Sequence, residues 1–155
     1  MNYSASISSC GKYRWNLARV WGTGSRAVFV LLNPSTADAH IDDPTLRRCI
    51  SFAKRESCGS LTVVNLFALR ATNPDLLLKA DDPVGAENAH YIVEAIESAD
   101  VIICGWGSKK IAEYESSKFV EKYGHRKLNC LARTKSGAPK HPLYVRGDAE
   151  LLSYP

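Results

Sequence analysis

Four side chains that could contact a ligand each follow an apolar segment of this 155-residue chain. They are Asn33 after AVFVLL, Asn65 at the end of LTVVN, Trp106 after VIIC, and His141 one loop beyond LNCLA. An amide offers a paired hydrogen-bond donor and acceptor, an imidazole can donate to a ligand oxygen, and an indole can stack on a flat ring. Residues of these types are candidates for one ligand-binding site.

The apolar segments that precede these residues have the composition of strands buried on both faces of a sheet. Strands are predicted at 27–32, 61–65, 101–104 and 128–132, with a further edge strand at 13–21. Helices are predicted at 43–57, 75–80, 84–99 and 109–124; Gly59 should end the first, and Gly124 should end the last in left-handed geometry. This alternation predicts an α/β fold with a mostly parallel sheet of four to five strands.

In a parallel sheet, the carboxyl ends of the strands share one edge, where loops and helix N-termini converge. The sequence therefore predicts one cleft that contains all four side chains. Each residue also has an ordinary structural role that the sequence leaves open. Asn33 could begin a turn, Asn65 could cap one, Trp106 could be a buried indole in a Gly-Trp-Gly turn, and His141 could lie on the surface.

Length and composition favour a single domain over residues 1–155 with a sizeable hydrophobic core. The net charge of +4 permits contact with phosphate but falls short of the charge typical of nucleic-acid-binding domains. The five cysteines form no CxxC pair, which favours free thiols in a reducing compartment over disulfides or a zinc ribbon. Without a membrane-length apolar run or a signal peptide, we expect a cytoplasmic protein with no membrane contact.

A group of potential metal ligands follows the first core strand, namely Asp38, His40, Asp42 and Asp43. Carboxylates and imidazole bind Mg²⁺, Mn²⁺ or Zn²⁺, so a metal-dependent phosphohydrolase is one alternative. However, Asp43 before Pro44 is explained as a helix N-cap, and no second acidic cluster follows another strand. We therefore predict no metal and no cofactor.

Basic residues near these segments could contact phosphate groups. Arg47 lies one turn into the predicted helix, and the polar loop 133–144 contains three more, Arg133, Lys135 and Lys140. A solvated surface would explain the same residues equally well.

Three segments, NPSTADAHIDDPTLRRC, VVNLFALRATNP and KHPLYV, resemble the bacterial and phage family called domain of unknown function 1643, from Tyr13 to about Val145. More distantly, the order of the motifs is similar to that of the uracil-DNA glycosylase superfamily. In that superfamily an apolar strand leads to a Gly-x-Asn-Pro-Gly or Gly-x-Asp-Pro-Tyr corner, another strand ends in a base-reading Asn, and a His-Pro loop follows. This resemblance implies a three-layer α/β/α fold with a pocket for a flipped base.

The same resemblance implies roles in the cleavage of an N-glycosidic bond, which leaves positive charge on the sugar and negative charge on the base. Asn33 would position the attacking water, and His141 would donate a hydrogen bond to the departing base. Asn65 would read the base edge, with Phe67 or Trp106 stacked on the ring. The ligand-binding residues would be Pro34, Ser35, Asn65, Phe67 and Trp106.

This chain departs from the superfamily motifs at three points. Leu32 replaces the glycine that lets the backbone approach the ligand, and Ser35 replaces a Gly or Tyr. The Ser-Pro portion of a His-Pro-Ser-Pro-Leu loop is absent after His141. The departures leave open whether the pocket has kept its catalytic activity.

As a whole, the sequence favours a nucleobase-recognising protein, most concretely a DNA base glycosylase that acts on an unmodified or modified base. The alternative is a non-catalytic module that binds a nucleotide or single-stranded nucleic acid, because fold and motif order do not fix a reaction. The expected partner is nucleic acid, DNA in preference to RNA, or a free nucleoside or nucleotide.

Overall fold

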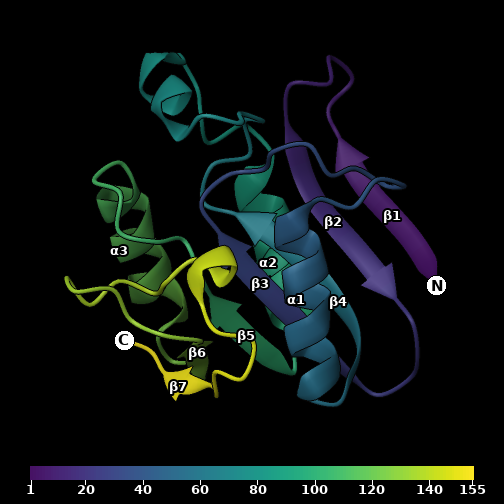
Figure 1. Cartoon of the computed structure of the whole chain (residues 1–155). Coiled ribbons are helices and arrows are strands. Elements are labelled where there is room, and N and C mark those ends of the chain that lie inside the picture. The colour runs from purple at the N-terminus through teal and green to yellow at the C-terminus, as the bar shows by residue number, and fades with distance from the viewer.

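The computed structural model describes residues 1–155 and contains a seven-stranded sheet (Figure 1). Its strands are β1 (Asn2–Ile7), β2 (Arg14–Val20), β3 (Ser25–Leu31), β4 (Cys58–Asn65), β5 (Val101–Cys104), β6 (Leu128–Cys130) and β7 (Leu152–Ser153). The helices are α1 (Pro44–Arg55), α2 (Asn88–Ser98) and α3 (Ala112–Tyr123), with the short 3₁₀ helices η1 (Pro74–Lys79) and η2 (Pro142–Tyr144). Across the sheet the strand order is β1-β2-β4-β3-β5-β6-β7.

The sheet is mixed, with a parallel centre and antiparallel flanks. Strands β4, β3, β5 and β6 are parallel, whereas β1, β2 and β7 join the sheet in antiparallel pairings. The predicted α/β class is confirmed, but the prediction of a mostly parallel sheet of four to five strands is wrong. The predicted edge strand at 13–21 is β2, which pairs on both sides. The edge strand beside β2 is β1, which is too polar for its sequence to identify it.

Helices cover both faces of the sheet (Figure 1). Leu46 and Phe52 of α1 belong to one core cluster with Phe29 of β3. The helices α2 and α3 contribute to the other cluster, which contains Val28 and Val30 of the same strand. Consecutive residues of β3 thus enter opposite cores, which is why the segment AVFVLL is apolar without alternation.

Helix α1 begins as the sequence predicts, with Pro44 at its first position and Asp43 as the N-cap. It ends at Arg55 with Glu56 as the C-cap, and Ser57 follows with a φ of 62°. The prediction that Gly59 ends this helix is wrong, because Gly59 lies inside β4. The prediction for Gly124 is also wrong, because its φ of −65° is right-handed. No helix of the protein combines the length and hydropathy that a membrane span requires.

A β-bulge in β2 sets the direction of the side chains at its start. The pairing with β1 passes from Asn16 to Arg14, so Trp15 has no partner residue. Trp15 stacks against Tyr91 of α2, whereas Leu17 belongs to the core cluster under α1. Regular alternation would put Trp15 and Leu17 on one face. The extra residue instead sends Trp15 toward α2 and leaves Arg14 on the other face.

Gly85, in the loop before α2, packs directly against the indole of Trp15. Gly85 has a φ of 91°, and a Cβ there would lie 2.5 Å from Cζ3 of the indole. We expect Gly85→Ala to lower the free energy of unfolding by about 2–4 kcal/mol, because it combines backbone strain with a clash. Urea denaturation measures this loss.

Gly137→Ala is the matched control for this substitution. Gly137 has a similar φ of 89°, but no atom lies within 4 Å of its added Cβ. Gly137→Ala should therefore lower the free energy of unfolding by about 1 kcal/mol, because it adds only backbone strain. Equal losses for the two variants would contradict the packing of Gly85 against Trp15.

Candidate functional site

A cavity of about 620 Å³ lies at the carboxyl ends of the parallel strands. That volume is in the range of pockets that bind small organic ligands. Segments far apart in the sequence meet here, since the loops after β3, β4 and β5 and the segment leading into η2 all contribute to its wall. Of the predicted site residues, those that line the cavity are Asn33, Pro34, Ser35, Asn65, Trp106, Lys140 and His141.

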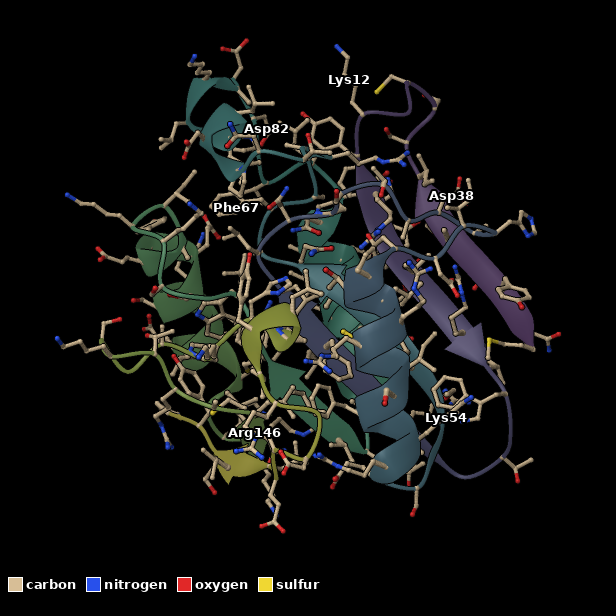
Figure 2. All side chains as sticks on the ribbon, in the orientation of Figure 1. Lys12, Asp38, Lys54, Phe67, Asp82 and Arg146 are labelled. Atoms are coloured by element: carbon tan, nitrogen blue, oxygen red, sulfur yellow. The ribbon has the colours of Figure 1, made fainter.

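Phe67 does not line the cavity, which corrects the prediction that it stacks on a ligand. Its ring is buried in the core cluster on the α2 and α3 side (Figure 2). The chain leaves strand geometry after Asn65, so strand alternation no longer governs which way Phe67 points. Trp106 does line the cavity, but it is almost fully buried and packs edge-on against Phe119 and Tyr154.

Three of the four predicted phosphate-binding residues also lie outside the cavity wall. Arg47 donates to the backbone carbonyl of Asp42, at 3.4 Å from Nη1. Arg133 donates to the backbone carbonyl of Ser153 in β7, and Lys135 is exposed on the loop. Of the basic side chains predicted for this role, Lys140 alone lines the cavity.

Arg14 lines the cavity and was missed by the sequence analysis. Only 3% of it is exposed, and its guanidinium donates to the backbone carbonyl of Ala37 and to Oδ1 of Asn65. Burial lowers the pKa of Arg14 to about 10, with the nearby Asp43 carboxylate acting in the opposite direction. Arg14 therefore keeps its charge at neutral pH. The sequence shows only an arginine in an apolar strand, because the bulge that turns it inward has no signature.

The contact with Arg14 fixes the amide orientation of Asn65. Arg14 Nη2 lies 3.4 Å from Asn65 Oδ1, which leaves Nδ2 of Asn65 without a hydrogen-bond partner. The Nε of Arg14 is likewise buried and unpaired. A buried donor without an acceptor costs about 1–3 kcal/mol. Both donors are buried by the protein itself, so a ligand acceptor reaches them only when neighbouring side chains shift.

Asn33 has a free hydrogen-bond acceptor, in contrast to the unpaired donors of Arg14 and Asn65. Its Nδ2 donates to the backbone carbonyls of Pro34 and Ala71, at 3.1 and 2.8 Å. These bonds tether the loop after β4 to the end of β3. Because the amide hydrogens are used, Oδ1 of Asn33 is the atom left to accept a hydrogen bond from water or a ligand.

His141 is held as a neutral imidazole with a defined tautomer. Its Nδ1 accepts a hydrogen bond from the backbone N–H of Leu143 at 3.2 Å, which places the ring proton on Nε2. Burial lowers the pKa of His141, and the Asp43 carboxylate opposes this shift. Its neighbour Pro142 sits against Gly105, where an added Cβ would come within 3.0 Å of the proline ring. The imidazole can therefore donate from Nε2 at neutral pH.

Arg48 of α1 positions the segment that contains His141. Its Nε donates to the carbonyl of Pro142 at 3.3 Å, and its Nη2 donates to the carbonyl of Val145. These two bonds bracket η2 and join it to α1. The side chain of Arg48 thus fixes the loop without being part of the cavity wall.

The potential metal ligands after β3 do not converge. Asp38 accepts hydrogen bonds from the backbone of its own loop, beside β1 and β2 (Figure 2). Asp42 pairs with the fully buried Arg19 at 2.9 Å, and Asp43 lines the cavity instead. No group of three or more His, Cys, Asp or Glu side chains is placed to hold a metal ion.

The role of Arg48 predicts a stability difference between two neighbouring arginines. Arg48→Ala should lower the free energy of unfolding by about 1.5–3 kcal/mol, because it removes two charge-assisted bonds to backbone carbonyls. It should also speed hydrogen exchange at the Leu143 amide, which NMR detects. Arg47→Ala, which removes one long exposed bond, should change stability by about 0.5 kcal/mol or less. Equal effects would refute the positioning role.

The lowered pKa of His141 predicts a pH dependence of stability. In the window just below 6.5, its ordinary value, the unfolded state binds more protons than the folded state, so stability falls as the pH falls. His141→Asn keeps an acceptor for the Leu143 N–H and does not titrate. Urea denaturation between pH 7.5 and 5.5 should therefore show a steeper loss for the wild type than for the variant. A flatter wild-type profile would contradict a buried neutral imidazole.

Comparisons with known proteins identify a family. The model of the family described as "Protein of unknown function (DUF1643)" matches residues 14–143. No curated protein and no solved structure matches the chain. The matched residues extend from the start of β2 into η2 and include all residues of the cavity wall except Tyr144. The chain therefore belongs to the DUF1643 family.

Proposed function

We propose that the protein binds a nucleobase in this cavity and hydrolyses the N-glycosidic bond that joins the base to a sugar. The observation that carries the proposal is that Asn33, Asn65 and His141 line one cavity although they are far apart in the sequence. Around them lie buried donors, one free amide acceptor and a neutral imidazole. This is the combination that reading a heterocycle edge requires.

Base recognition would use the unpaired donors of the cavity. Asn65 Nδ2 and Arg14 Nε are buried and lack acceptors, so once a shift of neighbouring side chains exposes them they would favour a base edge that carries carbonyl oxygens or unprotonated ring nitrogens. Such a base would remove the cost of leaving both donors unpaired. A ligand without acceptors would leave that cost in place.

Leaving-group stabilisation would come from His141 and the nearby positive charge. Negative charge develops on the base as the glycosidic bond breaks, and a donor already aimed at that atom lowers the barrier. His141 Nε2–H could supply this hydrogen bond, because Nδ1 is occupied by the Leu143 amide and His141 lines the cavity. Arg14 retains its charge in the same cavity wall, which further favours an anionic leaving group.

We also propose that the base reaches the cavity as part of DNA, as the resemblance to uracil-DNA glycosylases implies. Lys109, Lys140 and the largely exposed ring of Tyr144 line the cavity. Lysines can contact phosphates and an exposed tyrosine can stack on a flanking base. A glycosylase-like fold is supported by the parallel strand order β4-β3-β5-β6 with helices on both faces.

A panel of oligonucleotides with uracil, modified pyrimidines or mismatches tests the proposal, together with the matching free nucleosides. We expect release of free base, detected by chromatography, and an abasic site, detected by alkaline cleavage. Binding without release from any substrate would refute hydrolysis and favour the non-catalytic binding module. Absence of both binding and release would refute base recognition altogether.

Asn65→Asp tests the donor that the structure gives to the cavity. The substitution keeps the acceptor for Arg14 but replaces Nδ2–H by a carboxylate oxygen, so a base carbonyl would meet a repulsive atom. We expect affinity for the bound substrate to fall by about 10- to 100-fold, measured by fluorescence anisotropy. Asn16→Asp is the control, because Asn16 Oδ1 also accepts a hydrogen bond but lies outside the cavity wall. Equal affinities for both variants would contradict the role of Asn65.

A further inference from the structure

Asp43 is the one acidic residue among those that line the cavity. It is half-buried at the N-terminus of α1, where Oδ1 accepts a hydrogen bond from the Leu46 amide at 2.8 Å. That bond is the only one its side chain makes, and no basic side chain forms an ion pair with it. Oδ2 is therefore free to accept a proton or a hydrogen bond inside the cavity.

Asn33, His141 and Arg14, the residues assigned to water, base and charge recognition, cannot remove a proton from water. The amide of Asn33 can hold a water molecule but has no basic atom. His141 uses Nδ1 to accept from Leu143 and carries its proton on Nε2, so its basic atom is occupied. The guanidinium of Arg14 is protonated at neutral pH. A carboxylate is the remaining candidate for this step.

We propose that Asp43 is the general base of the hydrolysis, an inference that rests on the proposed function. A water molecule held by Asn33 Oδ1 attacks the anomeric carbon of the sugar while Oδ2 of Asp43 takes one of its protons. The new C–O bond forms as the C–N bond breaks, and the electron pair of that bond leaves with the base. The base anion accepts a hydrogen bond from His141 Nε2–H and then takes a proton from solvent.

The surroundings of Asp43 support this assignment independently of sequence motifs. Asp43 lines the same cavity as Arg14 and His141, and its negative charge opposes the lowering of their pKa values by burial. Capping α1 also immobilises the carboxylate, because the bond from Leu46 fixes one oxygen and directs the other. The residue thus combines a structural and a chemical task.

Asp43→Asn separates those two tasks. Asparagine caps helices as well as aspartate, so the fold should be retained, but it cannot accept a proton. In single-turnover assays on the substrate found in the panel, we expect base release to slow by about 10²- to 10⁴-fold. Affinity should stay within about threefold of the wild type, since the base-reading atoms are unchanged. Asp42→Asn is the matched control, because Asp42 pairs with Arg19 outside the cavity wall and should keep the wild-type rate.

Asp43→Gly provides a second readout that a capping role alone would not affect. Glycine is also tolerated as an N-cap and leaves room for a small acid. We expect formate, but not chloride at equal ionic strength, to restore base release in this variant at least tenfold. A wild-type enzyme that releases base while Asp43→Asn does so at a similar rate would overturn the inference and leave the proposed function intact. Binding without release by the wild type would overturn both.

Discussion

The buried guanidinium of Arg14 is the constraint on which the cavity depends. A buried charge is costly unless it is hydrogen-bonded. The guanidinium of Arg14 donates hydrogen bonds to the carbonyl of Ala37 and to the amide oxygen of Asn65. The first contact holds the loop after β3, and the second orients the amide at the end of β4. One side chain thereby contacts the segments at the ends of two neighbouring strands in the cavity wall. Its own Nε remains as a donor that the protein does not satisfy.

Helix α1 joins the remaining parts of the site. Its N-cap, Asp43, places a carboxylate in the cavity, and Arg48 one turn later holds the segment that contains His141. The close approach of Pro142 to Gly105 fixes the same segment against the end of β5. The imidazole and the carboxylate are thus positioned by a common element. This arrangement allows opposite polarities, a donor at His141 and an acceptor at Asp43, to be held in a single pocket.

The sequence predicts those elements and site residues whose positions follow from the pattern of side chains. It does not predict those whose positions follow from an irregularity of the backbone. The parallel strands and the start of α1 follow from apolar runs and the Asp-Pro cap, and strand-end geometry gathers Asn33, Asn65 and His141 in one cavity. Edge strands β1 and β7 are short or polar and depend on pairing with neighbours. Arg14 reaches the cavity through a bulge with no sequence signature, and Asp43 was explained completely by its cap. For Asp43, the role as helix cap left no reason in the sequence to expect a second role in the cavity.

Structures with bound ligand test most directly the proposal that a base edge contacts Asn65 and Arg14. Crystals soaked with uridine, thymidine, cytidine and deoxyadenosine would show which atoms the cavity contacts. We expect density for a base in the cavity, with ring acceptors about 2.7–3.2 Å from Asn65 Nδ2 and Arg14 Nε. Nucleoside density found only at other surfaces, or bases in the cavity that turn apolar edges toward these donors, would contradict nucleobase recognition by this site.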